Sequence, residues 1–360
     1  MNAGVLLAGA TSVLGLVFAL ALADQYRLRR QPFQVVWAIG MLFYGVAAGC
    51  EALAGAAGWN ELLYRTYYLT GAVWSVAWLG LGTAYLLART RFGYAFAFSL
   101  FLAGLFTFLT EQRYHYAGAG LSPLLYFAAA GILAIAIAVA TYFESRRWPM
   151  LAAVAVAGAT LLSLALMLST PLAAPGYELD PGTGQPLFDL LPGTLRLLTP
   201  YMNVTGAFSL LLGAVFSTYV FMPKRRLLPY SLDPTQPGDQ FLFNLLIAPV
   251  SIAVNLVVSL PGAARALVTG RLHSRVPATI LIAIGAFIQT VTDSASRFGD
   301  TGYRELGHFL AVVFIFLGFL ASIEVFHDVR VPFTGLVLWR AHREGDGPDP
   351  ETSGGTSPAG

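Results

Sequence analysis

Charged side chains are scarce in the long apolar stretches of this sequence, so those near them are candidates for binding or chemistry. Glu51 lies late in one apolar stretch, and Arg65 follows the short loop after it. A charge close to hydrocarbon is costly and usually marks a functional group or a buried partner. We predict an ion pair between Glu51 and Arg65, either at the mouth of a binding site or as an ordinary interfacial pair.

The next apolar stretch is rich in aromatic residues: residues 61–91 read ELLYRTYYLTGAVWSVAWLGLGTAYLLARTR. At about 100° per residue, aromatic and small residues form one helix face. That face comprises Tyr64, Tyr67, Tyr68, Gly71, Trp74, Ser75, Trp78, Gly82 and Tyr85. Tyrosine and tryptophan need polar partners away from water, and glycine admits a close neighbour. The face is either a packing surface or, from Tyr68 to Trp78, the lining of a pocket for an apolar or aromatic ligand.

Amide and carboxylate groups within other apolar stretches are candidates for a polar lining. Asn203 lies inside one such stretch and predicts an interhelical hydrogen bond or a contact with a ligand. Asn244, Asn255 and Asp293 lie further along the chain and, with Asn203, would line a transport path. Asp293 precedes Arg297 by four residues, which is the favourable order for an ion pair along one helix.

No motif for catalysis or metal binding is present in the sequence. It lacks a phosphate-binding Gly-rich loop, a His-Glu-x-x-His pair and a Gly-x-Ser-x-Gly elbow. Cys50 is the single cysteine, which excludes a disulfide framework and a Cys-x-x-Cys metal pair. We predict a non-enzymatic protein with no catalytic residue, metal or cofactor, and keep an intramembrane enzyme as a minor alternative.

The composition and the apolar pattern both predict a membrane protein. Hydrophobic residues make up 56% and charged residues 11%, whereas soluble domains carry about a quarter charged residues. Apolar spans fall at 4–24, 33–56, 67–88, 93–110, 121–143, 149–170, 197–222, 241–261, 277–294 and 306–327. They have the length of membrane-crossing helices. We expect an all-α, polytopic bundle of nine or ten spans in contact with membrane lipids. The net charge of +2 is too small to indicate nucleic-acid binding.

Basic residues predict the orientation of the first seven spans, because they concentrate on the cytoplasmic side of membranes. With the N-terminus outside, the inner loops carry Arg27, Arg29, Arg30, Arg89, Arg91, Arg146, Arg147, Lys224, Arg225 and Arg226. The outer loops carry Arg65, Arg113 and Arg196. Arginine greatly outnumbers lysine, which is typical of a bacterial protein of high GC content. The sequence therefore predicts a bacterial inner membrane with the N-terminus outside.

The segment 241–261 does not fit this pattern cleanly. If it crosses the membrane, the arginines after it fall outside, and if it returns to the same side they fall inside. Pro249 near its middle and the amides Asn244 and Asn255 suit a broken helix within protein. Its length suits an ordinary crossing. Both a spanning helix and a re-entrant or interfacial segment remain open.

The organisation predicted from these features has four parts. Residues 1–222 form a seven-helix unit, 223–240 a proline-rich cytoplasmic hinge, 241–330 a C-terminal membrane unit, and 331–360 a tail that is disordered from about residue 344. The seven-helix layout resembles bacterial seven-helix sensor modules in topology alone. The leading hypothesis is a sensor-like or accessory protein that binds a small hydrophobic ligand, a lipid or a partner helix. The alternative is a secondary transporter or channel that uses a broken segment around Pro249.

Overall fold

The computed structural model describes residues 3–143, 146–172, 179, 190–222, 225, 227–230, 238–269, 275–297, 303–321, 328–330, 332–334 and 337–340. These residues are helical except for a short antiparallel strand pair and the connecting turns. Nine helices in the described part of the chain are long and apolar enough to cross a membrane. The predicted helical membrane bundle is therefore confirmed. The tail after residue 340, with its predicted disorder, lies outside the described residues.

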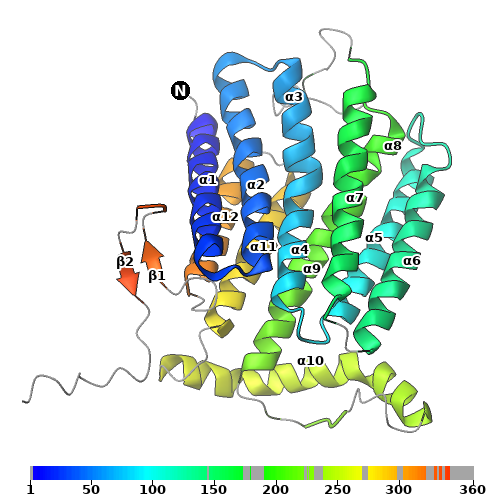
Figure 1. The fold of residues 1–360 in the computed structure, drawn as a ribbon, viewed down its shortest axis with the longest axis vertical. Coiled ribbons are helices and arrows are strands. Elements are labelled where there is room, and N and C mark those ends of the chain that lie inside the picture. The colour runs from blue at the N-terminus through cyan, green and yellow to red at the C-terminus, as the bar shows by residue number, and fades with distance from the viewer. Residues whose placement is uncertain are drawn as a thin grey trace, which may run out of the picture.

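The first seven predicted spans are long, adjacent helices (Figure 1). Their elements are α1 (Ala3–Arg29), α2 (Pro32–Ala57), α3 (Glu61–Tyr67), η1 (Tyr68–Trp74), α4 (Ser75–Leu86), α5 (Gly93–Tyr114), α6 (Ser122–Tyr142), α7 (Trp148–Ser169), α8 (Gly193–Arg196) and α9 (Leu198–Phe221). The short helix α8 leads directly into α9 and belongs to the seventh span. The segments α3, η1 and α4 form one continuous rod, which we call the third span. It begins six residues earlier than the hydropathy pattern predicts, because Asn60 caps it by accepting a hydrogen bond from the Leu63 amide.

The C-terminal part adds a helix pair and one helix in a different direction. Its elements are α10 (Gly238–Val268), α11 (Arg275–Arg297), α12 (Arg304–Ala321), β1 (Asp328–Arg330) and β2 (Val337–Arg340). Helix α11 packs on α12 and α9, and α12 also packs on α1. In contrast, α10 lies crosswise at one end of the bundle (Figure 1). It continues through Pro249 and Pro261 as a single helix, and it does not run through the bundle.

Two apolar clusters hold the bundle together. The larger one joins the third span to α5, α6, α7 and α9, with Phe96 and Trp148 among its fully buried residues. The second joins α1 and α2 to α12. In it the Phe319 ring lies 4.2 Å from the Trp37 ring and 5.2 Å from the Phe18 ring, measured between centroids. The helix pair α11–α12 is thus packed against the seven-helix unit through α12 on α1 and α2 and through α11 on α9.

Glycine permits a close helix contact between α4 and α9. A Cβ atom added at Gly80 would lie 2.7 Å from the Cα atom of Gly206. No ordinary side chain fits in that space, so the two backbones can touch here only because both residues are glycine. This contact fixes α9 against the third span just below the π-helical segment η1.

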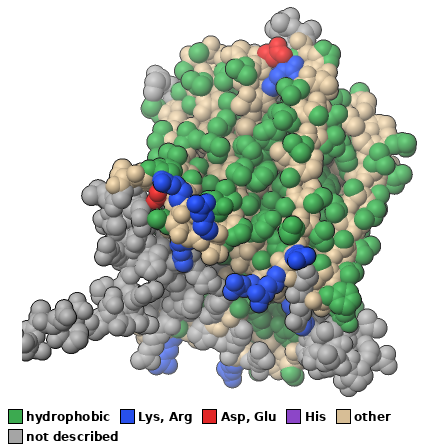
Figure 2. All heavy atoms as spheres, viewed as in Figure 1, with side chains coloured by type: hydrophobic (Ala, Val, Ile, Leu, Met, Phe, Trp, Pro, Cys, Tyr) green, Lys and Arg blue, Asp and Glu red, His purple; other side chains and the backbone are tan. Residues whose placement is uncertain are grey.

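The surface divides into an apolar band and a basic end. Figure 2 shows hydrophobic side chains over most of the visible face, with Lys and Arg side chains mainly toward the end where α10 lies. Arg29 ends α1 and Arg30 follows it, Arg89 and Arg91 follow α4, and Arg147 precedes α7, all at this end. We call it the basic end. The apolar band is the surface that a membrane-embedded protein presents to lipid.

Candidate binding site around the π-helical segment

The third span contains a π-helical segment at its centre. In η1 the backbone bonds skip one residue more than in an α-helix, as the Ser75 amide shows by donating to the Thr70 carbonyl. Such segments are rare and occur frequently at functional sites. The segment is largely buried among neighbouring helices and contains Tyr68 and Trp74, two of the residues predicted to line a pocket.

Helix α9 approaches η1 through polar side chains on successive turns. The hydroxyls of Tyr68 and Thr199 lie 2.8 Å apart, and the amide nitrogen of Asn203 donates to the Ala72 carbonyl at 2.9 Å. The interhelical hydrogen bond predicted for Asn203 is present. The side-chain oxygen Oδ1 of Asn203 is buried and has no hydrogen-bond partner among the described residues.

Helix α7 receives the two tryptophans of the third span. The indole of Trp74 donates to the Ser163 hydroxyl at 2.8 Å, and that of Trp78 donates to the Thr160 hydroxyl at 3.1 Å. The Phe43 ring of α2 lies on the other side of Trp74, at 4.9 Å between centroids. Helix α7 also contacts α9, so that α7, η1 and α9 meet at one junction. We call it the η1 junction.

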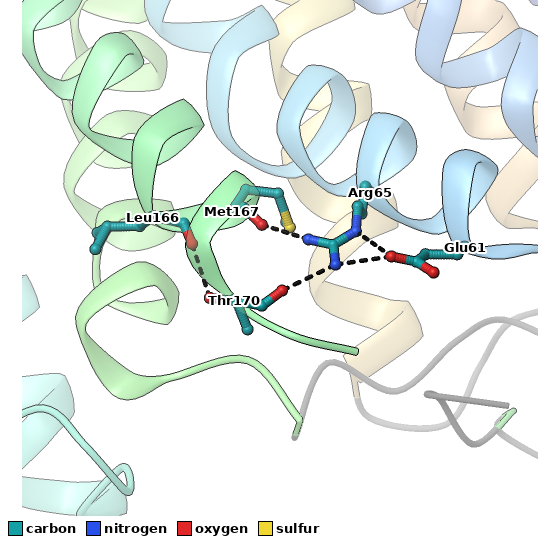
Figure 3. A network of polar contacts seen from close by, with 5 residues as sticks. All are labelled: Glu61, Arg65, Leu166, Met167 and Thr170. Atoms are coloured by element: carbon teal, nitrogen blue, oxygen red, sulfur yellow. Dashed lines mark hydrogen bonds and ion pairs between the residues drawn. The ribbon is translucent and has the colours of Figure 1, made fainter. Parts of the chain in front are cut away.

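Arg65 closes the end of α7 that lies near the start of the third span. Its guanidinium donates to the carbonyls of Met167 and Thr170, the latter at 2.8 Å, and it pairs with Glu61 at 2.8 Å (Figure 3). Carbonyls at a helix C-terminus lack partners within the helix and attract positive charge. Arg65 therefore ties α3 to α7 next to the η1 junction.

The predicted ion pair between Glu51 and Arg65 is wrong. Glu51 pairs instead with Arg304 at the start of α12, at 3.0 Å, and Arg304 also donates to the Tyr67 hydroxyl at 2.6 Å. The side chains of Arg304 and Glu51 are 12% and 13% exposed. The aromatic face consequently divides, because Tyr67 turns toward α12 whereas Tyr68 meets α9 and Trp74 meets α7.

A second polar contact lies deeper between α2 and the C-terminal helix pair. The Tyr44 hydroxyl lies 3.0 Å from the Gln289 side-chain oxygen and 3.1 Å from the His308 carbonyl. Tyr44 precedes Glu51 by seven residues, or two helical turns along α2. Glu51, Arg304, Tyr67, Tyr44 and Gln289 thus form polar contacts along the seam between α2, α11 and α12, which we call the α2–α12 seam.

The polar residues predicted to line a transport path do not all come together. Asn203 lies in the η1 junction, whereas Asn255 lies on α10 and binds the backbone of Leu227 and Leu228 at 2.8–3.0 Å. The side chains of Asn244 and Asp293 lie outside the described residues. In the described part of the chain, Asn203 and Asn255 therefore belong to separate regions.

Comparison with known proteins adds no family to this picture. No protein-family model, curated protein or solved structure matches the chain. The functional reading therefore depends on the chemistry of the η1 junction and the α2–α12 seam.

Several contacts in these two regions have a signal in the sequence and others do not. Thr160 and Ser163 are polar residues three positions apart in the apolar span 149–170, a spacing that places them on one helix face. Arg304, in contrast, lies 253 residues from Glu51. Its pairing depends on how α12 packs on α2, which no local pattern indicates.

Proposed function

We propose that the chain is a non-enzymatic, multi-pass protein of a bacterial cytoplasmic membrane, with its N-terminus outside. It binds a small hydrophobic molecule that carries one hydrogen-bond donor, and it does so in the η1 junction. The role is sensor-like, because a ligand at this position touches three helices and changes how α7 and α9 pack on the third span.

The unpaired oxygen of Asn203 is the observation that carries this proposal. Its amide nitrogen is used by the Ala72 carbonyl, while Oδ1 is buried without a partner among the described residues. An unpaired buried acceptor costs about 1–3 kcal/mol. Water or a ligand is the usual explanation for such an atom. A ligand hydroxyl or amine would donate to Oδ1 and remove that cost.

The neighbouring side chains suit an apolar ligand body. Trp74 and Trp78 provide large, flat surfaces, and ligand pockets in proteins are typically lined by such aromatic groups. The buried face of α7 is small, with Ala155, Ala159 and Ser163 among its residues. Few bulky side chains would have to move when a ligand enters between α7 and the third span.

The test is retention of a co-purified molecule by the full chain in lipid nanodiscs, measured by native mass spectrometry. We expect the wild-type protein to retain a hydrophobic molecule. We expect the Trp74→Phe/Trp78→Phe variant and the Asn203→Leu variant each to lose roughly tenfold in occupancy or more. The loss of one hydrogen bond of about 1.4 kcal/mol changes binding tenfold.

Trp148→Phe is the matched control for the tryptophan changes. Trp148 is 1% exposed and donates to the Ala88 carbonyl, so the same substitution removes an equivalent buried hydrogen bond away from the η1 junction. This variant should retain the molecule. If all three variants retain it equally, or the wild-type protein retains none, the ligand-binding proposal is wrong.

A secondary transporter is the second candidate, and the α2–α12 seam is the observation that favours it. Ionisable groups within membrane helices often mark substrate or ion pathways. The Glu51–Arg304 pair and the Tyr44–Gln289 contact lie between the seven-helix unit and the C-terminal helix pair. Ion or solute flux into liposomes that is lost in Glu51→Gln would support transport over ligand binding alone.

A further inference from the structure

Helix α10 presents an apolar face that no other part of the described chain covers. Six large apolar residues along it are between 51% and 88% exposed: Phe243, Leu246, Val250, Val257, Leu260 and Val268. Their spacings of three, four, seven and eight residues place them on one side of the helix. The sequence contains no charged residue between Asp239 and Arg265.

The opposite face of α10 is polar and is bound to the chain segment that precedes the helix. Ser251, Asn255 and Ser259 are at most 2% exposed. Asn255 accepts from the amides of Leu227 and Leu228 and donates to the Leu228 carbonyl. Ser259 accepts from the Arg225 amide at 2.9 Å. Asn255 and Ser259 are therefore bonded to Arg225, Leu227 and Leu228 and are buried from water.

The position of this segment shows which way the apolar face points. Residues 227–230 pass beneath α10 in Figure 1, on the side away from the bundle. Asn255 faces that segment, so the apolar face turns toward the level of the bundle. Ala263 and Leu256 of α10 pack with Met222 and Val276.

We propose that α10 is an in-plane membrane helix whose apolar face is covered by the acyl chains of an anionic lipid leaflet. Three observations select lipid as the occupant. The face lies at the level where the spanning helices end. It is apolar over its whole length, as an interfacial helix requires. The basic end surrounds it, and the exposed Arg225 and Arg265 flank it, so that anionic headgroups are attracted to the same surface.

This inference does not depend on the ligand proposed for the η1 junction. The η1 junction is a buried site for a small molecule, whereas α10 provides an extended, exposed surface for lipid at the basic end. A helix of this kind couples the loop 225–230, and through it the end of α9, to the composition of the leaflet.

The depth of α10 in a bilayer tests the proposal. Nitroxide labels would be placed singly at Leu246, Val257 and Ala264 in the full chain carrying Cys50→Ala, reconstituted in bilayers containing phosphatidylglycerol. Collision rates with oxygen and with a water-soluble nickel chelate report the depth of each label. Ile132 on α6, which is 68% exposed in the apolar band, provides the deep reference. Leu227, which is 53% exposed, provides the shallow one.

The expected result is that all three labels on α10 lie at one shallow depth, equal within roughly one helical turn of about 5 Å. Oxygen collisions should exceed nickel collisions at each position. A crossing helix would instead separate Leu246 from Ala264 by about 27 Å, with Val257 deepest, and would overturn the proposal. Low collision rates for both reagents would also overturn it, because they indicate cover by a second copy or another protein. High nickel collision rates would mean exposure to water and would have the same consequence.

The contribution of lipid charge is tested with the same Val257 label. Bilayers of phosphatidylcholine alone should raise its nickel collision rate relative to bilayers with phosphatidylglycerol. Arg265→Gln should produce a rise in the anionic bilayers, whereas Arg113→Gln, an exposed arginine at the opposite end, should not. An identical rate in both bilayers would remove the anionic lipid from the proposal.

Discussion

The largely buried ion pair between Glu51 and Arg304 links the seven-helix unit to α12. Removing one partner of such a pair leaves the other charge buried, which is far more costly than the pair itself. Tyr67 shares the guanidinium, so one arginine connects α2, the third span and α12.

Glu51→Gln should lower the free energy of unfolding by about 3 kcal/mol. The matched change Glu61→Gln should cost less than about 1 kcal/mol, because Glu61 is 54% exposed and exposed pairs contribute little. Unfolding by a denaturing detergent, followed by circular dichroism, measures both. Equal effects of the two changes would mean that the Glu51–Arg304 pair adds no more than an exposed pair.

At the residue scale, the sequence identified polar residues that lie within apolar spans. Asn203 and Glu51 stand out because polar groups are costly in apolar spans, and both have buried partners in the structure. The partner of Glu51 was missed. Whether Glu51 pairs with Arg65 or with Arg304 depends on tertiary packing. Arg65 binds backbone carbonyls at the end of α7 instead, which hydropathy does not reveal.

At the scale of the elements, the positions of the helices follow from hydropathy, and the start of the third span follows from the Asn60 cap. The π-helical segment could not be predicted from hydropathy, because the periodicity analysis assumes a constant angle of about 100° per residue. Tyr67 and Tyr68 are consecutive, so they point in different directions once α12 and α9 are in place. A stripe drawn at a constant angle therefore merged contacts that belong to three neighbouring helices.

The contact between α4 and α9 provides a prediction for an element. Gly80→Ala should destabilise the bundle by about 1–3 kcal/mol, because the new methyl group would lie 2.7 Å from the Gly206 Cα atom and force the helices apart. Gly158→Ala in α7 is the control, since nothing lies within 4 Å of its added Cβ atom. It should be neutral or stabilising by up to about 1 kcal/mol. Thermal unfolding of both variants in nanodiscs checks this, and a neutral Gly80→Ala would contradict the close backbone contact.

At the scale of the whole molecule, α10 decides how the chain is arranged in the membrane. Its amino-acid composition is compatible with a crossing helix, and its length is sufficient for one. The structure instead places it across the basic end (Figure 1). Composition could not distinguish these outcomes, because the hydrogen-bond partners of Asn255 and Ser259 are the backbone groups of Arg225, Leu227 and Leu228, which lie outside the helix.

An in-plane α10 also makes the charge distribution of the whole chain consistent. Helix α9 ends at the basic end, where α10 follows it. Helix α11 then starts from the same end. Arg271 and Arg275 follow α10 and would remain on the side that carries most other arginines. With this arrangement, the first seven spans, α11 and α12 would cross the membrane and α10 would not.

Sidedness of two connecting loops is the measurement on which the membrane arrangement depends. Single cysteines at Ala117, between α5 and α6, and at Ser274, between α10 and α11, would be introduced into the full chain carrying Cys50→Ala. A membrane-impermeant thiol reagent would then be applied to intact and to lysed cells. We expect Ala117→Cys to react in intact cells and Ser274→Cys to react only after lysis. Reaction of both cysteines in intact cells would show that α10 crosses the membrane. Reaction of Ser274→Cys with protection of Ala117→Cys would show that the proposed orientation is reversed.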